Sequence, residues 1–224
     1  MKALLSGLSL LVFIPLIQAQ TQTSYTLDQV FANMDMVAKT FRSSQADIVR
    51  THVTVLVNDK DVSAGRFYYV RQGKEPRVKL ELAKPNVQQL LIDKGQLQIY
   101  TPNLKQVQRA SVSGHQDKVE MFMALGFGQT SQDLLKNFSV SLAGEELIDG
   151  RKTSVLELKP KNSAMFKLVQ MWMDQKTWVS IQIKTTEPSG DYQSLKFSAV
   201  RLNSKIPESV FNLKLPKDVQ VLKM

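Results

Sequence analysis

Cysteine is absent from all 224 residues of the chain. The chain therefore has no disulfide, no thiol nucleophile and no cysteine-based metal site, and it is not a lipoprotein anchored through an N-terminal cysteine. Histidine is scarce as well: His52 and His115 are far apart and show no spacing typical of a metal site. Phosphate-cradling glycine loops and the local motifs of serine hydrolases are also missing. We therefore expect no catalytic residue, no cofactor and no bound metal.

Long apolar runs are confined to the N-terminus. Lys2 is followed by an almost wholly apolar stretch from Leu4 to Ile17, and Ala19 offers a small residue before Gln20. This layout is typical of a secretory signal peptide, and the run is short for a transmembrane helix, which needs roughly 20 residues. The alternative is an uncleaved anchor, because Ile17 is large for its place near the cut. We expect a signal peptide over residues 1–19 and a single soluble domain over residues 20–224.

The net charge of +9 is basic, and it loses one unit when Lys2 leaves with the signal peptide. Such a balance is compatible with nucleic acid, an anionic membrane surface or an acidic partner. Export argues against nucleic acid, and the Lys and Arg residues are scattered singly along the chain. A solvated basic surface is therefore the simpler interpretation, with a specific patch as the alternative.

The clearest helix is expected over Thr26–Phe41, where apolar residues recur every three or four positions. Thr26 is a suitable N-cap, and Gln29 stands three residues later, as in a capping box. This helix should pack one apolar stripe on a sheet.

From Asp47 the apolar period changes to two. Val49, Val53, Val55 and Val57 alternate with polar residues, which predicts a half-buried strand before a turn at 58–61. Short helices are expected at 118–127 and 131–138. Further strands are expected at 65–71, 78–82, 87–92, 97–99, 104–109, 138–147, 153–158, 166–173, 178–185 and 192–202, with a short final run at 219–222. About eleven strands without helical crossovers indicate an antiparallel sandwich or barrel.

Two expected strands, around 67–70 and 166–173, carry large apolar residues on both faces. A sheet with one face in water should not do this, so something must cover the second face. The first helix can cover part of it, and the methionine-rich segment 119–127 can cover more. Methionine suits surfaces that repack around variable ligands, although these helices could instead only fill a core.

The segment from Gly65 to Arg109 resembles the LolA family of periplasmic outer-membrane lipoprotein carriers. A glycine-led aromatic strand ending in arginine (GRFYYVR), a strand closed by proline, and the stretches LLIDKG, LQIY and LKQVQR follow one another in the order of the family. The C-terminal half matches more loosely, through MWMDQKTW and the closing FNLKLPKDVQVL. Gln72 stands where the family usually has proline, which leaves open a divergent carrier or a relative with another lipid-like cargo. The residues that fall in family positions are Gly65, Phe67, Tyr69, Arg71, Pro85, Asp93, Gly95, Tyr100 and Val107.

The resemblance implies an incomplete, half-open β-barrel of about eleven antiparallel strands, with an N-terminal amphipathic helix and short mid-chain helices as a lid. Its cavity would hold the acyl chains of lipoproteins, which an inner-membrane exporter supplies and an outer-membrane acceptor receives. Burying such chains is worthwhile because each buried CH₂ contributes roughly 0.8 kcal/mol. We expect a periplasmic monomer that carries acylated lipoproteins.

The resemblance and the apolar pattern together suggest which residues contact the acyl chains. The face that each strand residue presents depends on a register that the sequence does not give. The candidates are Phe67, Tyr69, Leu80, Leu91, Ile99, Met121, Phe122, Leu125 and Trp172. Arg71 occupies the position of the arginine that bonds the lid and helps control its opening in the family; a strand-end arginine in water is the alternative.

Two other functions stay open. The main rival is a lipid- or lipoprotein-sensing module on the same scaffold, like the envelope-stress regulators that resemble these carriers. Those regulators normally carry an extra C-terminal domain, whereas this chain ends at Met224, which favours the carrier. A hydrolase is the third interpretation, and it would need a buried serine beside His52 or His115.

Overall fold

The computed structural model describes residues 24–72, 75–83, 85–112, 127–162 and 166–223. Within these residues it has two α-helices, twelve strands and three short 3₁₀ turns. The helices are α1 (Leu27–Thr40) and α3 (Ser131–Asn137), and the turns are η1 (Val55–Val57), η2 (Pro102–Leu104) and η4 (Glu208–Phe211). The strands are β1 (Ser43–Thr54), β2 (Asp59–Gln72), β3 (Glu75–Leu82), β4 (Gln88–Asp93), β5 (Gln96–Thr101), β6 (Gln106–Ser111), β7 (Phe138–Ile148), β8 (Arg151–Pro160), β9 (Leu168–Asp174), β10 (Ser180–Thr186), β11 (Tyr192–Leu202) and β12 (Gln220–Lys223).

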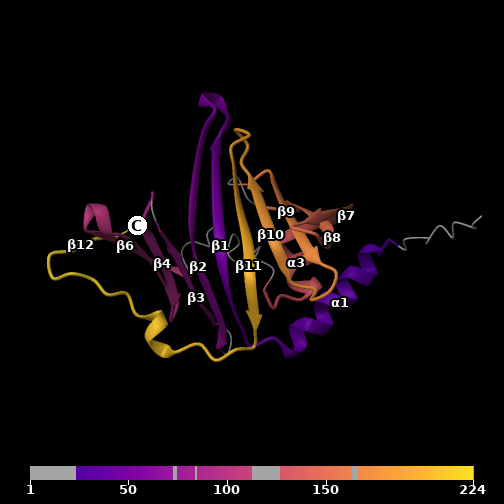
Figure 1. Cartoon of the computed structure of the whole chain (residues 1–224), viewed down its shortest axis with the longest axis horizontal. Coiled ribbons are helices and arrows are strands. Elements are labelled where there is room, and N and C mark those ends of the chain that lie inside the picture. The colour runs from indigo at the N-terminus through magenta and orange to yellow at the C-terminus, as the bar shows by residue number, and fades with distance from the viewer. Residues whose placement is uncertain (1–23, 73–74, 84, 113–126, 163–165, 224) are drawn as a thin grey trace, which may run out of the picture.

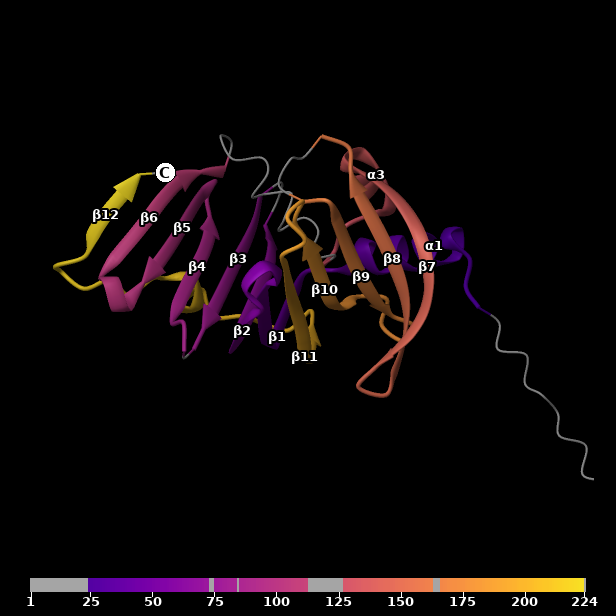
Figure 2. The ribbon, with the colours of Figure 1, turned by 90° about the horizontal axis from the view of Figure 1, so that it is seen from above.

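All twelve strands belong to one curled sheet, in the order β12-β6-β5-β4-β3-β2-β1-β11-β10-β9-β8-β7. The sheet consists of two antiparallel meanders, β1–β6 and β7–β11, which meet where β1 pairs with β11 (Figures 1 and 2). The sheet stays open, with β12 and β7 as its edges. This confirms the half-open antiparallel barrel; β12 adds one parallel pair with β6.

Helix α1 begins as its sequence predicts. The Thr26 side chain accepts a hydrogen bond from the Gln29 backbone, and the Gln29 side chain accepts one from the Thr26 backbone. This capping box satisfies two donors that the first turn would otherwise leave free. Val30, Met34 and Ala38 form the buried stripe, so the helix covers part of the sheet, as the two-faced strands require.

Cross-strand register divides the sheet into two faces. Ala46, Phe67, Leu80, Leu90 and Ile99 lie opposite one another along successive strands and therefore share a face. These residues belong to, or pack against, the core that also contains α1 and α3 side chains; we call this the helix-side face. The other side is the outer face.

The outer face of the N-terminal meander has a cover of its own. The C-terminal stretch leaves β11 and crosses to the far edge of the sheet, where β12 joins β6 (Figure 1). On the way, the buried Phe211 of η4 lies under the Arg77 guanidinium, 4.4 Å from the ring centroid. Arg77 also pairs with Asp93 and Glu208. The C-terminal stretch is thus attached to β3 by the contact of Phe211 with Arg77 and by the Arg77–Glu208 ion pair, while Asp93 of β4 holds Arg77 from the sheet.

The first strand corrects one expectation. The predicted buried valines lie on its outer face or beyond its end: the strand stops at Thr54, and Val49, Val55 and Val57 are exposed. The buried apolar residues of β1 are Ala46 and Ile48 on the helix-side face. Alternation identifies a strand but does not say which of its faces the fold covers.

Candidate functional site: the helix-side face and Arg71

An aromatic cluster fills the centre of the helix-side face. Phe67 of β2 and Phe197 of β11 lie 5.5 Å apart between ring centroids, on the two sides of β1. Phe127, the residue just after segment 113–126, packs against both, at 5.1 Å and 5.0 Å. All three rings are buried. The chain that follows segment 113–126 is therefore anchored in the middle of the sheet, over the seam between the two meanders.

Arg71, near the end of β2, links this anchor to helix α1. One guanidinium nitrogen, Nη1, donates to the Ala38 carbonyl in the last turn of α1 at 2.8 Å, and Nη2 donates to the Gly128 carbonyl. The guanidinium also lies 5.7 Å from the centroid of the Phe41 ring. A cation is favoured at helix C-terminal carbonyls, and charge-assisted hydrogen bonds are stronger than neutral ones. Arg71 thus holds together three chain segments beside the aromatic cluster.

Gly128 is a residue of this site that the sequence did not reveal. Its φ of +70° lies in the left-handed region, and a Cβ there would stand 2.2 Å from Phe41 Cδ1 and 2.8 Å from Arg71 Nη2. Only glycine avoids both the backbone strain and the clash. A Gly-Phe-Gly sequence hints at a close approach, but the partner comes from 57 residues away in the chain.

Tyr69 of β2 lies two residues before Arg71 in the same strand and therefore on the same face of the sheet. Burial raises the pKa of its hydroxyl above the ordinary value, and the charge of Arg71 partly offsets that rise. Its ring packs on Phe41 at 5.3 Å. Tyr69 is therefore a neutral side chain at neutral pH, and it offers the helix-side face a hydroxyl without a charge.

The structure separates the predicted acyl-chain contacts into three groups. Phe67, Tyr69, Leu80 and Ile99 lie on the helix-side face, within or against its core. Leu91 and Trp172 are buried on the outer face, where Leu91 of β4 lies opposite Lys79 of β3 in the strand register. Trp172 pairs with Gln182, and its Nε1 donates to Glu146 at 2.8 Å. Met121, Phe122 and Leu125 lie outside the described residues.

Because Leu91 and Trp172 are on the outer face, we no longer count them among the candidate acyl-chain contacts. Their large apolar side chains suggested the cavity, but a sheet covered on both sides buries such residues on either face. The register places Leu91 opposite Lys79 and Gln98, and Trp172 opposite Gln182 and Val155.

The described part of the chain holds no group of three or more His, Cys, Asp or Glu residues that could bind a metal ion. His52 lies near the end of β1, opposite Asp61 and Gln193, and His115 is outside the described residues. None of the helices in the described ranges is long and apolar enough to cross a membrane.

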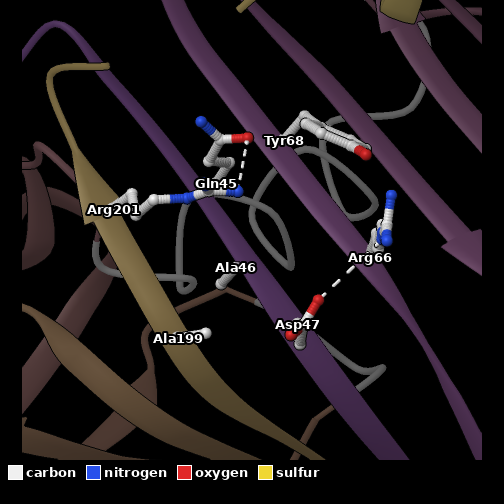
Figure 3. A pocket seen from close by; sticks show the side chains of 7 residues that line it. All are labelled: Gln45, Ala46, Asp47, Arg66, Tyr68, Ala199 and Arg201. Atoms are coloured by element: carbon white, nitrogen blue, oxygen red, sulfur yellow. Dashed lines mark hydrogen bonds and ion pairs between the residues drawn. The ribbon is translucent and has the colours of Figure 1, made fainter.

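A separate polar depression of about 180 Å³ lies on the outer face, across β11, β1 and β2 (Figure 3). Arg201 reaches Gln45 at 3.5 Å, and Arg66 faces Asp47 at 3.9 Å. Tyr68 closes one side. Both arginines are exposed, so this depression is a cationic surface feature and no part of the aromatic cluster.

Residues 51–214 match the family of outer membrane lipoprotein carrier proteins, LolA. The chain belongs to this family. It is 27% identical over 221 residues to the outer-membrane lipoprotein carrier protein of Bordetella avium, with 98% of each chain covered. An uncharacterized protein of Methanocaldococcus jannaschii is 29% identical over 96 residues, which are 43% of this chain but only 27% of that protein. The resemblance inferred from residues 65–109 is therefore confirmed.

Solved structures share this fold at low sequence identity. An uncharacterized conserved protein from Thermus thermophilus has a TM-score of 0.56 at 13% identity, over 88% of this chain and 98% of that one. MucB has a TM-score of 0.52 at 13% identity, over 87% of this chain. The chain spans 64% of MucB, so this similarity concerns one part of that protein and its fold.

Proposed function

We propose that this LolA family member is a periplasmic carrier that holds the acyl chains of lipoproteins against its helix-side face. It would take them from an inner-membrane exporter and pass them to an outer-membrane acceptor. The observation that carries the proposal is the combination of an open sheet, an apolar face under α1, and Arg71 bound to both segments that cover this face. The signal-peptide pattern of residues 1–19 fits the periplasm.

The chemistry of the face suits a ligand that must be released without an energy source. Aromatic and aliphatic side chains, which form the core cluster of this face, offer burial worth roughly 0.8 kcal/mol per CH₂. In the described arrangement Phe127 packs on both Phe67 and Phe197, which also contact each other. An acyl chain that binds to Phe67 and Phe197 must first displace Phe127; we call the arrangement with Phe127 in place the closed arrangement. Displacing Phe127 costs free energy, which lowers the net affinity for the acyl chain and makes its release feasible.

Arg71 is the proposed control point of this competition. Its two hydrogen bonds stabilise the closed arrangement, and a ligand that displaces Phe127 and Gly128 must break at least one of them. By population shift, weakening the closed state strengthens ligand binding by the same free energy. The arginine thereby sets a balance between loading and release.

A sensing module on the same scaffold remains the second candidate. The structural similarity to MucB concerns the fold alone, and both functions would use an apolar face. The two differ in what the ligand does next: a carrier passes it on, whereas a sensor changes its own contact with a partner protein. A transfer assay separates them.

The first test is to purify the protein from the periplasm and identify bound material by mass spectrometry. We expect acylated lipoprotein or its lipid portion, and we expect the purified protein to bind a triacylated lipopeptide. Recovery of no lipid or acylated protein, together with no lipopeptide binding, would refute the carrier.

The second test replaces Arg71 by leucine. Because each hydrogen bond to a charged donor contributes about 1.5–3 kcal/mol, and the group is only partly buried, we expect lipopeptide to bind about tenfold more tightly or better and to be released more slowly. Lys39→Leu is the matched control: it removes the same charge one residue from Ala38, at an exposed position. Equal effects of the two variants would remove Arg71 from the release step.

A further inference from the structure

The tip of the β1–β2 hairpin carries the most exposed apolar surface among the described residues. Val55, Leu56 and Val57 follow one another in η1 and are 52%, 93% and 68% exposed. Figure 1 shows this hairpin rising beyond the neighbouring strands. Val49 and Val62 extend the apolar surface along the outer face of the hairpin. Contiguous exposed apolar surface of this kind marks an interaction site, whereas single exposed residues need no explanation.

The tip is held in a defined shape. The Val55 backbone N–H donates to Asp191 Oδ1 at 2.8 Å, and the Asn58 N–H donates to the Val55 carbonyl at 3.2 Å. Asn58 adopts the left-handed conformation that closes the turn, with φ of 50°. The loop between β10 and β11 therefore supports the hairpin tip from the side. The side chain of Leu56 is presented to solvent by a turn in which the Val55 N–H, the Val55 carbonyl and the Asn58 N–H have hydrogen-bond partners.

Charge is distributed unequally between the two faces of this hairpin. Lys60 lies opposite Val53 in the strand register, on the outer face. Lys184 lies on the same face, with its Nζ 4.2 Å from the Tyr192 ring centroid. Asp59 and Asp61 lie on the helix-side face, where Asp61 pairs with Arg50 at 3.2 Å. Among the described residues of β1 and β2, the one carboxylate on the outer face, Asp47, faces Arg66 at 3.9 Å. Farther along the outer face stand Arg66 and Arg201 of the cationic depression (Figure 3). The apolar tip thus borders a face on which cations predominate.

We propose that the tip of the β1–β2 hairpin docks on an anionic phospholipid bilayer. Val55, Leu56 and Val57 enter the boundary between head groups and acyl chains, and Lys60 and Lys184 contact lipid phosphates from the outer face. Apolar side chains next to basic ones bind the interface of anionic membranes through burial of the apolar groups and attraction of the basic groups to anionic lipids. The three paired backbone groups of the turn lower the cost of entering a poorly hydrated layer. The proposal does not depend on acyl-chain binding, and it would let a carrier approach a bilayer in one orientation.

The absence of native cysteine allows a single probe at the tip. Leu56→Cys is labelled with an environment-sensitive fluorophore and mixed with vesicles of phosphatidylethanolamine and phosphatidylglycerol. Leu104→Cys is the matched control, because η2 is a similar 3₁₀ turn with one exposed leucine followed by a left-handed residue. We expect a blue shift and quenching by lipid-borne quenchers at position 56 and neither at position 104. Vesicles of phosphatidylcholine alone should give a weaker response.

Vesicle sedimentation of the chain without its signal peptide supplies the free-energy test. Removing one inserted leucine by Leu56→Ser should lower the partition coefficient about tenfold or more, since burying such a side chain is worth about 1.5–3 kcal/mol. Leu104→Ser should leave it unchanged. The proposal is overturned if the unaltered protein does not bind anionic vesicles, or if both serine variants lose binding equally.

It is also overturned if sedimentation velocity finds a dimer that Leu56→Ser converts to monomer without any vesicle binding, because a second copy of the chain would then cover the tip. Lipopeptide binding is measured on the same samples. If the unaltered protein docks on vesicles but does not bind lipopeptide, only the carrier proposal is refuted. If it binds lipopeptide but does not dock on vesicles, only the docking of the hairpin tip is refuted.

Discussion

Replacing Gly128 by alanine tests the close packing between the chain after segment 113–126, Phe41 and Arg71. The left-handed φ of +70° costs a non-glycine residue about 1–2 kcal/mol. The new methyl group would also lie 2.2 Å from Phe41 Cδ1, and Phe41 is buried. Forcing a buried ring to move costs typically about 1–3 kcal/mol. We therefore expect Gly128→Ala to lower the free energy of unfolding by about 3 kcal/mol, measured by urea denaturation.

The matched control is Gly150→Ala. Gly150 has a similar φ of +74°, but no heavy atom lies within 4 Å of its Cβ position. Only the backbone strain applies there, so we expect a loss of about 1–2 kcal/mol. The difference between the two variants isolates the contact with Phe41 and Arg71. Equal losses would contradict the described packing, and a further gain in lipopeptide affinity in Gly128→Ala alone would link this contact to the closed arrangement.

Two further changes test other parts of the fold. Asp174 is buried, which favours its protonated form, but hydrogen bonds from Thr177 and the charge of Arg151 outweigh burial and lower its pKa. Its stabilising contribution is therefore present above about pH 4 and is lost as the pH falls through the lowered pKa. We expect Asp174→Asn to lower the free energy of unfolding by about 2 kcal/mol at neutral pH. We also expect the stability of this variant, measured by urea unfolding, to fall less at acidic pH; an unchanged loss of stability at acidic pH would contradict this. Phe211→Ala should cost about 3 kcal/mol and raise hydrogen exchange in β12, whereas Val221→Ala, at a half-exposed position, should change little.

Local pattern predicted the elements of this protein well. The threonine cap and apolar spacing located α1 to within one residue at each end. The change from a period near four to a period of two, and the turn residues between runs, located most strands of both meanders. The second strand is longer than expected, because β2 begins at Asp59 and not at Gly65. The ordered motifs from Gly65 to Arg109 then supplied the family and the half-open barrel, because several weak signals in a fixed order are more specific than any one of them.

Local pattern could not assign faces or partners. Leu91 looked like a cavity residue, and only the register with Lys79 places it on the outer face. The valines of β1 looked like core, but the core is formed by Ala46 and Ile48. Gly128 became important only through Phe41 and Arg71, which are distant in the chain. Each of these facts depends on long-range packing, which a window of ten residues does not contain.

The pairing of β1 with β11 has a consequence for how the protein reaches its native state. Residues near 48 find their partners near 197, about 150 positions later in the chain. Until β11 is in place, β1 is an edge strand with free backbone donors and acceptors, a state prone to pairing with other chains. Contacts of such sequence separation also slow folding, because the loop must close before the contact forms. The first strand of the sheet in chain order is thus among the last to be completed, and one of its edges stays open until the second meander is in place.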